Sequence, residues 1–173
     1  MRPLLILLCY ELADGKNIEE IMPLAVAFEM IHSATLIHDD INDNAKLRRG
    51  VPTIHEKAGP VKAQITGDWL FVQGFGLGGI YDEKIVSIMA NCCAKIASAE
   101  LEQYRHIHDI TTTPEDYFKI IEGKTAGPFS AGCEASAIVA KSSDKHISLM
   151  KEFGLQVGVA FQIVDDLLDL IGD

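Results

Sequence analysis

The chain has 173 residues, of which 48% are hydrophobic and 23% charged, so it holds enough apolar material for the core of one globular domain. Its formal net charge of −10 argues against binding to nucleic acid or to an anionic membrane surface, because both partners need a basic face. The four cysteines follow no CxxC or framework spacing, which predicts reduced thiols in a cytoplasmic protein.

The first segment, residues 1–9, begins with a basic residue and is then apolar, as in a short secretion signal. The apolar run is short and Glu11 interrupts it, so we expect no signal peptide. No uninterrupted apolar stretch is long enough to span a bilayer. The sequence also contains no linker, so we expect one helical domain over residues 1–173.

Helical periodicity runs through nearly the whole chain, and strand signals are almost absent. Residues 18–38 place apolar side chains on one stripe at spacings of three and four, and residues 147–171 do the same. Thr113, followed by Pro114 and two acidic residues, predicts the capped start of another helix. The stripes consist of Ile21, Leu24, Ala25, Phe28, Ile31 and Thr35 in the first segment, and Leu149, Phe153, Val157, Phe161, Val164 and Leu168 in the second.

Two acidic clusters with the same spacing lie in these helical segments, one at residues 39–43 and one at residues 165–169. Their Asp-Asp-x-x-Asp pattern places carboxylates one turn apart on one helix face, where like charges repel. Each cluster therefore needs a compensating cation. Oxygen ligands favour Mg²⁺, which takes one or two protein carboxylates and completes its shell with water and substrate phosphate. Arg48 and Arg49, just beyond the first cluster, suit bidentate phosphate recognition.

The segment from His38 to Thr53, with its acidic cluster and arginine pair, resembles the first aspartate-rich region of the trans-isoprenyl diphosphate synthases. Gly67-Asp68, Lys124-Thr125 and the segment from Phe161 to Asp169 are similar to later landmarks of that family, in the same order. Within this pattern we interpret Gly67 and Asp68 as a helix cap. The resemblance extends from Arg2 to Asp173.

This resemblance implies an all-α bundle of antiparallel helices around a central substrate cavity, the isoprenoid synthase fold, and a homodimer. It further implies a prenyltransferase that condenses isopentenyl diphosphate with an allylic diphosphate, using three Mg²⁺, to make a longer trans-polyprenyl diphosphate. Metal ions at the acidic clusters would stabilise the allylic diphosphate as it leaves, in a dry apolar pocket.

The resemblance also assigns site residues. The metal ligands are expected to be Asp39, Asp40, Asp43, Asp165, Asp166 and Asp169. The catalytic residues are expected to be Asp39, Asp40, Asp165 and Lys124. The allylic diphosphate is expected to be bound by Arg48, Lys124, Thr125 and Gln162, and isopentenyl diphosphate by Arg2, His32 and Arg49.

Product length in this family depends on side chains that line the cavity before the first acidic cluster. The residues expected in this chain-length pocket are Ala34, Thr35, Met30 and Ile31. Short-chain members commonly carry aromatic rings at the positions of Ala34 and Thr35. Both side chains are small here, so the resemblance implies a product of geranylgeranyl length or longer.

The sequence departs from the family pattern at both ends. The basic stretch that usually precedes Arg2 is absent, and so are the helices that normally follow the second acidic cluster. We therefore expect an incomplete bundle, truncated at both ends, with apolar helix faces exposed.

Two alternatives stay open beside chain elongation. A class I terpene cyclase shares an aspartate-rich first motif, but it usually carries a second motif of the Asn/Ser/Glu type. A noncatalytic partner subunit of a prenyl synthase tends to lose the acidic motifs. The cluster at Asp165 to Asp169 and the Arg48-Arg49 pair favour elongation over both.

Overall fold

The structure is a computed structural model that describes residues 1–172, and it confirms the predicted all-α fold. Within residues 1–172 the only strands are two short ones that form a hairpin after α2. In chain order the elements are α1 (Arg2–Leu12), α2 (Ile18–Asn42), β1 (Leu47–Arg48), β2 (Val51–Pro52), α3 (Ile54–Ala58), α4 (Pro60–Gly78), α5 (Glu83–Arg105), α6 (Pro114–Ile121), the π-helix η1 (Glu122–Ala126), α7 (Gly127–Val139) and α8 (Asp144–Ile171).

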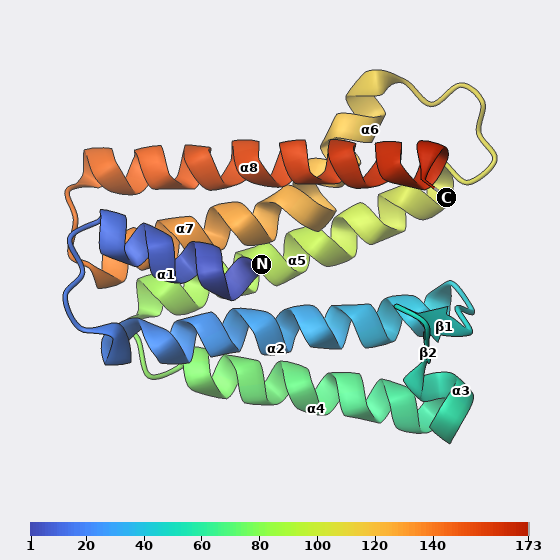
Figure 1. Cartoon of the computed structure of the whole chain (residues 1–173), viewed down its shortest axis with the longest axis horizontal. Coiled ribbons are helices and arrows are strands. Elements are labelled where there is room, and N and C mark those ends of the chain that lie inside the picture. Colours follow the sequence, from blue (N-terminus) through green and yellow to red (C-terminus); the bar gives the residue numbers. More distant parts are fainter. Residues whose placement is uncertain (173) are drawn as a thin grey trace.

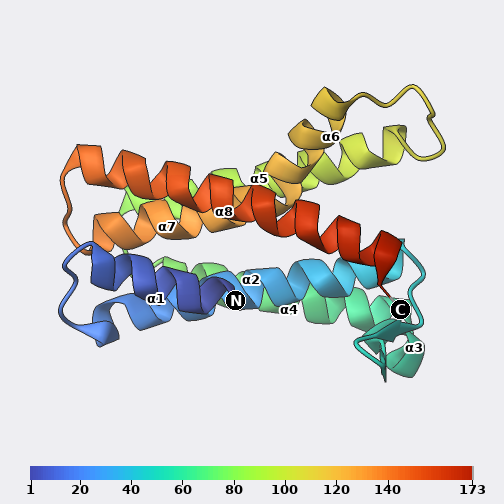
Figure 2. The ribbon, with the colours of Figure 1, turned by 45° about the horizontal axis from the view of Figure 1, so that its top comes forward.

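The long helices form an antiparallel bundle. Figure 1 shows that α2, α5 and α8 run in one direction, whereas α1, α4 and α7 run back. Figure 2 shows α5, α7 and α8 on one side of the bundle and α2 and α4 on the other, and α1 packs against both α2 and α7. The C-terminal ends of α2 and α8, which carry the two acidic clusters, consequently lie at the same end of the bundle.

The helix α2 is the centre of the core. Asn17 caps its start, since its side chain accepts a hydrogen bond from the backbone N–H of Glu19. The predicted stripe is buried from Ile21 to Ile31, where it meets buried side chains of α1, α5 and α7. By length and composition α2 alone among the helices of residues 1–172 could cross a membrane, but 44% of its apolar window is buried within the bundle, as in a core helix.

The start of α6 follows the prediction in detail. The Thr113 hydroxyl accepts a hydrogen bond from the Asp116 backbone N–H, and the Asp116 carboxylate accepts one from the Thr113 backbone N–H. This reciprocal capping box, with Pro114 at the first position, confirms the predicted helix start. By contrast, the prediction for Gly67 and Asp68 was wrong, because both lie inside α4 rather than at its end.

The helix α8 is attached to the bundle through glycines. Gly154 and Gly158 are its buried residues, whereas the apolar side chains of Leu149, Phe153 and Leu168 are exposed. A Cβ atom added at Gly154 would lie 2.6 Å from the Phe129 carbonyl oxygen, and one at Gly158 would lie 2.4 Å from Ala126 Cα. Only glycine permits this approach of α8 to α7 and η1.

We therefore expect Gly154→Ala to lower the free energy of unfolding by about 1–3 kcal/mol, because the added methyl group meets backbone rather than a flexible side chain. Gly76→Ala in α4 is the matched control, since a Cβ atom there would have no neighbour within 4 Å. The control should raise stability by about 0.5–1 kcal/mol through helix propensity. Urea denaturation of both variants measures the difference. Equal stability of the two variants would contradict close packing at Gly154.

Candidate functional site

The first acidic cluster occupies the last turn of α2, and its carboxylates have different surroundings. Asp40 is buried and accepts a hydrogen bond of 2.7 Å from Arg48 Nε. Asp39 is half-buried, and burial raises its pKa to about 6, although nearby Lys124 acts to lower it. Asp43 is exposed one turn further along the same face. Of the three, Asp39 thus carries an incompletely compensated charge that a cation would stabilise.

The hairpin after α2 arranges the two arginines. Arg48 is the last residue of β1 and pairs with Val51 of β2. In this position the Arg48 side chain reaches Asp40. Arg49 and Gly50 form the two-residue loop, and both have positive φ angles, of 53° and 76°. Positive φ at both loop positions is the geometry of a tight type I′ hairpin, and it is uncommon for a residue with a side chain. The hairpin thus separates neighbouring arginines, with Arg48 on the first cluster and Arg49 exposed at the turn.

In the second acidic cluster too, the second carboxylate is bound to protein donors, whereas the other two are exposed. Asp166 accepts hydrogen bonds from the Tyr117 hydroxyl and from Gln162 Nε2, the latter at 2.8 Å. Gln162 Oε1 in turn accepts a bond of 2.6 Å from the hydroxyl of buried Thr125. Burial, together with the bond to Asp166, raises the pKa of Tyr117 to about 12, so its hydroxyl is a donor at neutral pH. Asp165 and Asp169 are exposed.

Lys124 is held by two residues of α5. Its Nζ atom lies 2.6 Å from Glu100 Oε2, an ion pair without hydrogen-bond alignment, and donates a bond of 2.9 Å to Gln103 Oε1. Lys124 lies in the π-helix η1, a type of turn that is frequent at functional sites. The sequence pattern does not single out Glu100, Gln103 or Tyr117. The available signal was a pair of polar residues, three apart, near the end of α5.

A small cavity of about 30 Å³ brings together side chains from α1, α2, α5 and the η1–α7 junction. Arg2, His32 and Lys124 are the residues with basic side chains in its wall. The Arg2 guanidinium stacks over the Phe129 ring, 4.9 Å from its centroid, and its buried Nε atom has no hydrogen-bond partner. The remaining wall residues are Phe28, Ile31, Thr35, Met89, Cys92, Cys93, Ile96 and Pro128. The cavity therefore combines an unpaired cationic group with apolar walls.

His32 is neutral in this cavity. Burial lowers its pKa to about 3, and the positive charges of Arg2 and Arg49 act in the same direction. The charges of Arg2 on α1 and of Arg48 and Arg49 in the hairpin all act on this one ring. Guanidinium groups suit an anion with several negative oxygens.

The four residues predicted for the chain-length pocket lie at different places around α2, and the prediction itself stays a prediction. Ile31 and Thr35 line the cavity, but Ala34 and Met30 do not belong to its walls within residues 1–172. Ala34 is fully buried on the stripe that includes Ile31 and His38, and these two side chains face Gly74 and Gly67 of α4. Ala34 consequently packs at the α2–α4 contact, where its small size lets the helices approach.

Asp68 also has a role different from the predicted cap. Its Oδ1 atom lies 3.3 Å from His38 Nε2, and the His38 ring stacks on Phe71. A Cβ atom added at Gly67 would lie 2.3 Å from that same nitrogen, so glycine is needed for the ring to fit. Gly67 and Asp68 therefore secure the end of α2 directly before Asp39.

The fit of these residues to Mg²⁺ can be judged from the donors. Within residues 1–172 no group of three or more His, Cys, Asp or Glu side chains is arranged to hold a metal ion. Mg²⁺ needs fewer protein ligands, because it keeps waters and takes phosphate oxygens. Asp39 with Asp43, and Asp165 with Asp169, are carboxylate pairs that fit this requirement. Asp40 and Asp166 fit less well, because protein donors already engage them.

Comparison with known proteins identifies the family. The polyprenyl synthetase family matches residues 1–173, and the chain belongs to it. The geranylgeranyl diphosphate synthase of Saccharolobus solfataricus is 36% identical over 181 residues, covering 100% of this chain and 54% of that protein. The octaprenyl diphosphate synthase of Escherichia coli is 33% identical over 154 residues, covering 87% and 47%.

Solved structures agree with this assignment. A polyprenyl synthase from Caulobacter crescentus, in complex with calcium and isoprenyl diphosphate, has a TM-score of 0.96 and 36% identity over 99% of this chain and 52% of that one. The geranylgeranyl pyrophosphate synthetase of Pyrococcus horikoshii has a TM-score of 0.93 and 31% identity, covering 100% of this chain and 54% of that one. The chain spans about half the length of these relatives.

The depressed pKa of His32 makes a prediction about pH. The unfolded chain binds a proton at this residue near the ordinary pKa of 6.5, whereas the folded chain does not until about pH 3. Stability from His32 is therefore present above pH 6.5 and is lost as the pH falls. Relative to His32→Gln, the wild type should lose about 1–2 kcal/mol between pH 7 and pH 5, with solvent screening limiting the loss. Urea denaturation across this range tests it. Parallel curves for the two proteins would show that His32 titrates normally.

Proposed function

We propose that the protein is a Mg²⁺-dependent prenyltransferase that condenses isopentenyl diphosphate with an allylic diphosphate. The observation that carries this proposal is the cavity in which the unpaired Nε atom of Arg2 and the neutral ring of His32 meet apolar walls. An isoprenyl diphosphate has the complementary chemistry, with an anionic head and an apolar chain. The names of the relatives, geranylgeranyl and octaprenyl diphosphate synthase, support the same reaction.

The two substrates would be bound by different groups. Arg2, His32 and Arg49 are the residues expected to hold isopentenyl diphosphate, and the buried Nε donor of Arg2 has no hydrogen-bond partner. Arg48, Lys124 and Gln162 are assigned to the allylic diphosphate, and each is now paired with a protein group that the diphosphate would replace or share. This difference favours an isopentenyl site that is formed in advance and an allylic site that rearranges on binding.

The acidic clusters would face the allylic diphosphate from two helices. Asp39 with Asp43 on α2 and Asp165 with Asp169 on α8 are the pairs we assign to metal ions, three Mg²⁺ in all by family resemblance. Bound Mg²⁺ would neutralise the diphosphate and make it a better leaving group. Lys124 and Arg48 would add fixed positive charge to the leaving oxygens. Calcium and isoprenyl diphosphate together in the Caulobacter crescentus relative support a divalent cation here.

The cavity of about 30 Å³ has room for about one water molecule, so it would have to widen for its apolar side to hold a growing hydrocarbon chain and exclude water. Phe28 of α2 and Met89 and Ile96 of α5 belong to its apolar walls. Thr35 of α2 also lines the cavity, and its side chain is small. We propose a product of geranylgeranyl length or longer, in agreement with the names of the relatives from Saccharolobus solfataricus and Escherichia coli.

A homodimer is proposed from one exposed face of α4. Val61, Ile65, Trp69 and Val72 recur at spacings of three and four, and all four side chains are exposed. A stripe of this kind, with a central tryptophan, is typical of a protein–protein interface. The mass in solution decides this point. We also propose a cytoplasmic location, which the four free cysteines support.

The reaction is tested by incubating the chain with Mg²⁺, labelled isopentenyl diphosphate and allylic primers, and by sizing the products. Asp39→Ala or Asp165→Ala should reduce turnover by roughly 10²–10³, the scale for the loss of one preorganised electrostatic contact. Glu152→Ala, an exposed acidic residue of α8 outside the clusters, is the matched control and should keep wild-type turnover. Near-normal turnover of either aspartate variant at limiting Mg²⁺ would refute the assignment.

The position of Thr35 allows a test of product length. Thr35→Phe places a ring in the cavity wall and should shift the products to shorter chains, with the first condensation nearly intact. Ala34→Phe is the matched control, because the new ring would enter the packed α2–α4 contact instead. The control should lower the free energy of unfolding by about 1–3 kcal/mol without changing product length. If Ala34→Phe shortened the products instead and Thr35→Phe did not, the hydrocarbon chain of the product would have to contact the face of α2 that carries Ala34.

A further inference from the structure

The helix α6 has a contact that the proposed reaction does not use. Tyr117 is half-buried, and its hydroxyl donates to the Asp166 carboxylate of α8 across 49 residues of sequence. This bond and the bond from Gln162 Nε2 together engage both oxygens of Asp166. Asp166 is the second residue of its acidic cluster, and its neighbour Asp165 is exposed.

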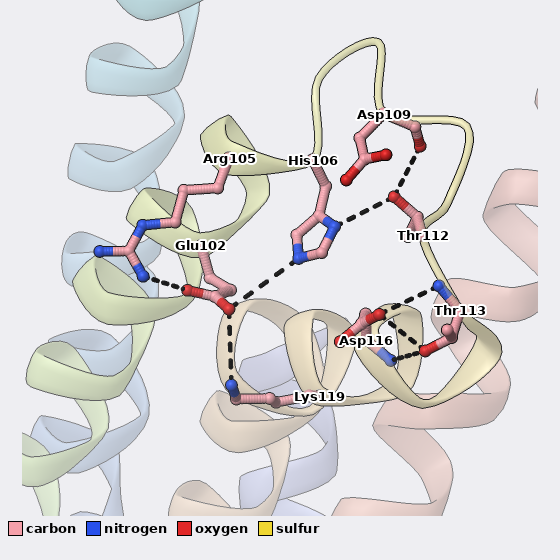
Figure 3. A network of polar contacts seen from close by, with 8 residues as sticks. All are labelled: Glu102, Arg105, His106, Asp109, Thr112, Thr113, Asp116 and Lys119. Atoms are coloured by element: carbon pink, nitrogen blue, oxygen red, sulfur yellow. Dashed lines mark hydrogen bonds and ion pairs between the residues drawn. The ribbon is translucent and has the colours of Figure 1, made fainter.

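The position of Tyr117 is fixed from the other side of α6. Figure 3 shows the polar network that joins α6 to the end of α5 and to the loop between them. Glu102 of α5 lies 3.5 Å from Lys119 Nζ of α6 and 2.9 Å from Arg105 Nη1. The capping box of Thr113 and Asp116 then fixes the first turn of α6, directly before Tyr117. The helix that carries Tyr117 is therefore anchored independently of α8.

The first acidic cluster has the equivalent arrangement. Its second residue, Asp40, accepts a bond of 2.7 Å from Arg48, which is held by the hairpin. In both clusters the second carboxylate is thus bound to a neighbouring element, while the first and fifth carboxylates are left for other ligands. The donors differ, because Arg48 brings a positive charge and Tyr117 brings only a polar O–H group.

We infer that Tyr117 is a positioning residue, which fixes the second acidic cluster by holding Asp166 so that Asp165 and Asp169 face the diphosphate. This inference rests on the proposed function for its purpose, but the contact itself does not. A hydrogen bond to a carboxylate is stronger than one between neutral groups. Loss of the hydroxyl would leave Asp166 with Gln162 alone, on the same helix one turn away, so the final turns of α8 would lose their attachment to α6.

The test compares Tyr117→Phe, which removes only the hydroxyl, with Tyr104→Phe as a matched control. Tyr104 is an exposed tyrosine of α5, and no side-chain hydrogen bond involves it within residues 1–172. Amide hydrogen exchange of residues 162–171 is measured without metal, with peptides of α4 as an internal reference. Calorimetry then measures the Mg²⁺ concentration needed for half-maximal binding of inorganic diphosphate.

Tyr117→Phe should accelerate exchange in residues 162–171 by tenfold or more, leave α4 unchanged, and raise the Mg²⁺ requirement at least fivefold. Tyr104→Phe should change neither. Unchanged exchange in α8, or an equal acceleration in α4 that shows general destabilisation, would overturn the inference. If the wild type binds no diphosphate with Mg²⁺, the proposed function fails, and the exchange comparison alone decides the role of Tyr117.

Discussion

Carboxylates placed together at the C-terminal end of a helix repel one another and also repel the partial negative charge of the last carbonyl groups. The helix α2 meets this condition, because its last turn contains acidic residues and no basic residue. The surrounding structure answers the repulsion in several ways. Arg48 neutralises Asp40 and Asp43 remains in solvent, whereas burial disfavours the charged form of Asp39 and raises its pKa to about 6. The hairpin that carries Arg48 thus relieves part of this repulsion at the end of α2.

The two acidic clusters lie near the C-terminal ends of separate helices, α2 and α8. The segment that carries Lys124 lies between α5 and α8, and it contacts both of them. Lys124 itself is engaged by Glu100, a further acidic residue, so even this cation is partly compensated. Among residues 1–172, ion pairs to the clusters and to Glu100 come from Arg48, which contacts Asp40, and from Lys124, which contacts Glu100.

Much of this arrangement could be predicted from the sequence, and the parts that could not have a common cause. Spacing along a helix specifies which residues share a face, so the stripe of α2 and the start of α6 at Thr113 were predictable. Spacing does not specify which neighbour covers that face. Asp68, for example, was assigned to a cap although it lies in mid-helix beside His38. Partners such as Tyr117 belong to other helices and become visible only in the folded bundle.

The π-helix η1 has a consequence for how this segment tolerates change. Helix is continuous from Pro114 to Val139, and η1 closes its turn over one residue more than an α-helical turn does. Each residue of an α-helix turns the chain by about 100°, so deletion of one residue within η1 would rotate α7 by that amount relative to α6. A different face of α7 would then meet Gly154 of α8. The number of residues in the η1 turn therefore sets the rotation of α7 relative to α6. A one-residue deletion in η1 would change the fold more than most substitutions.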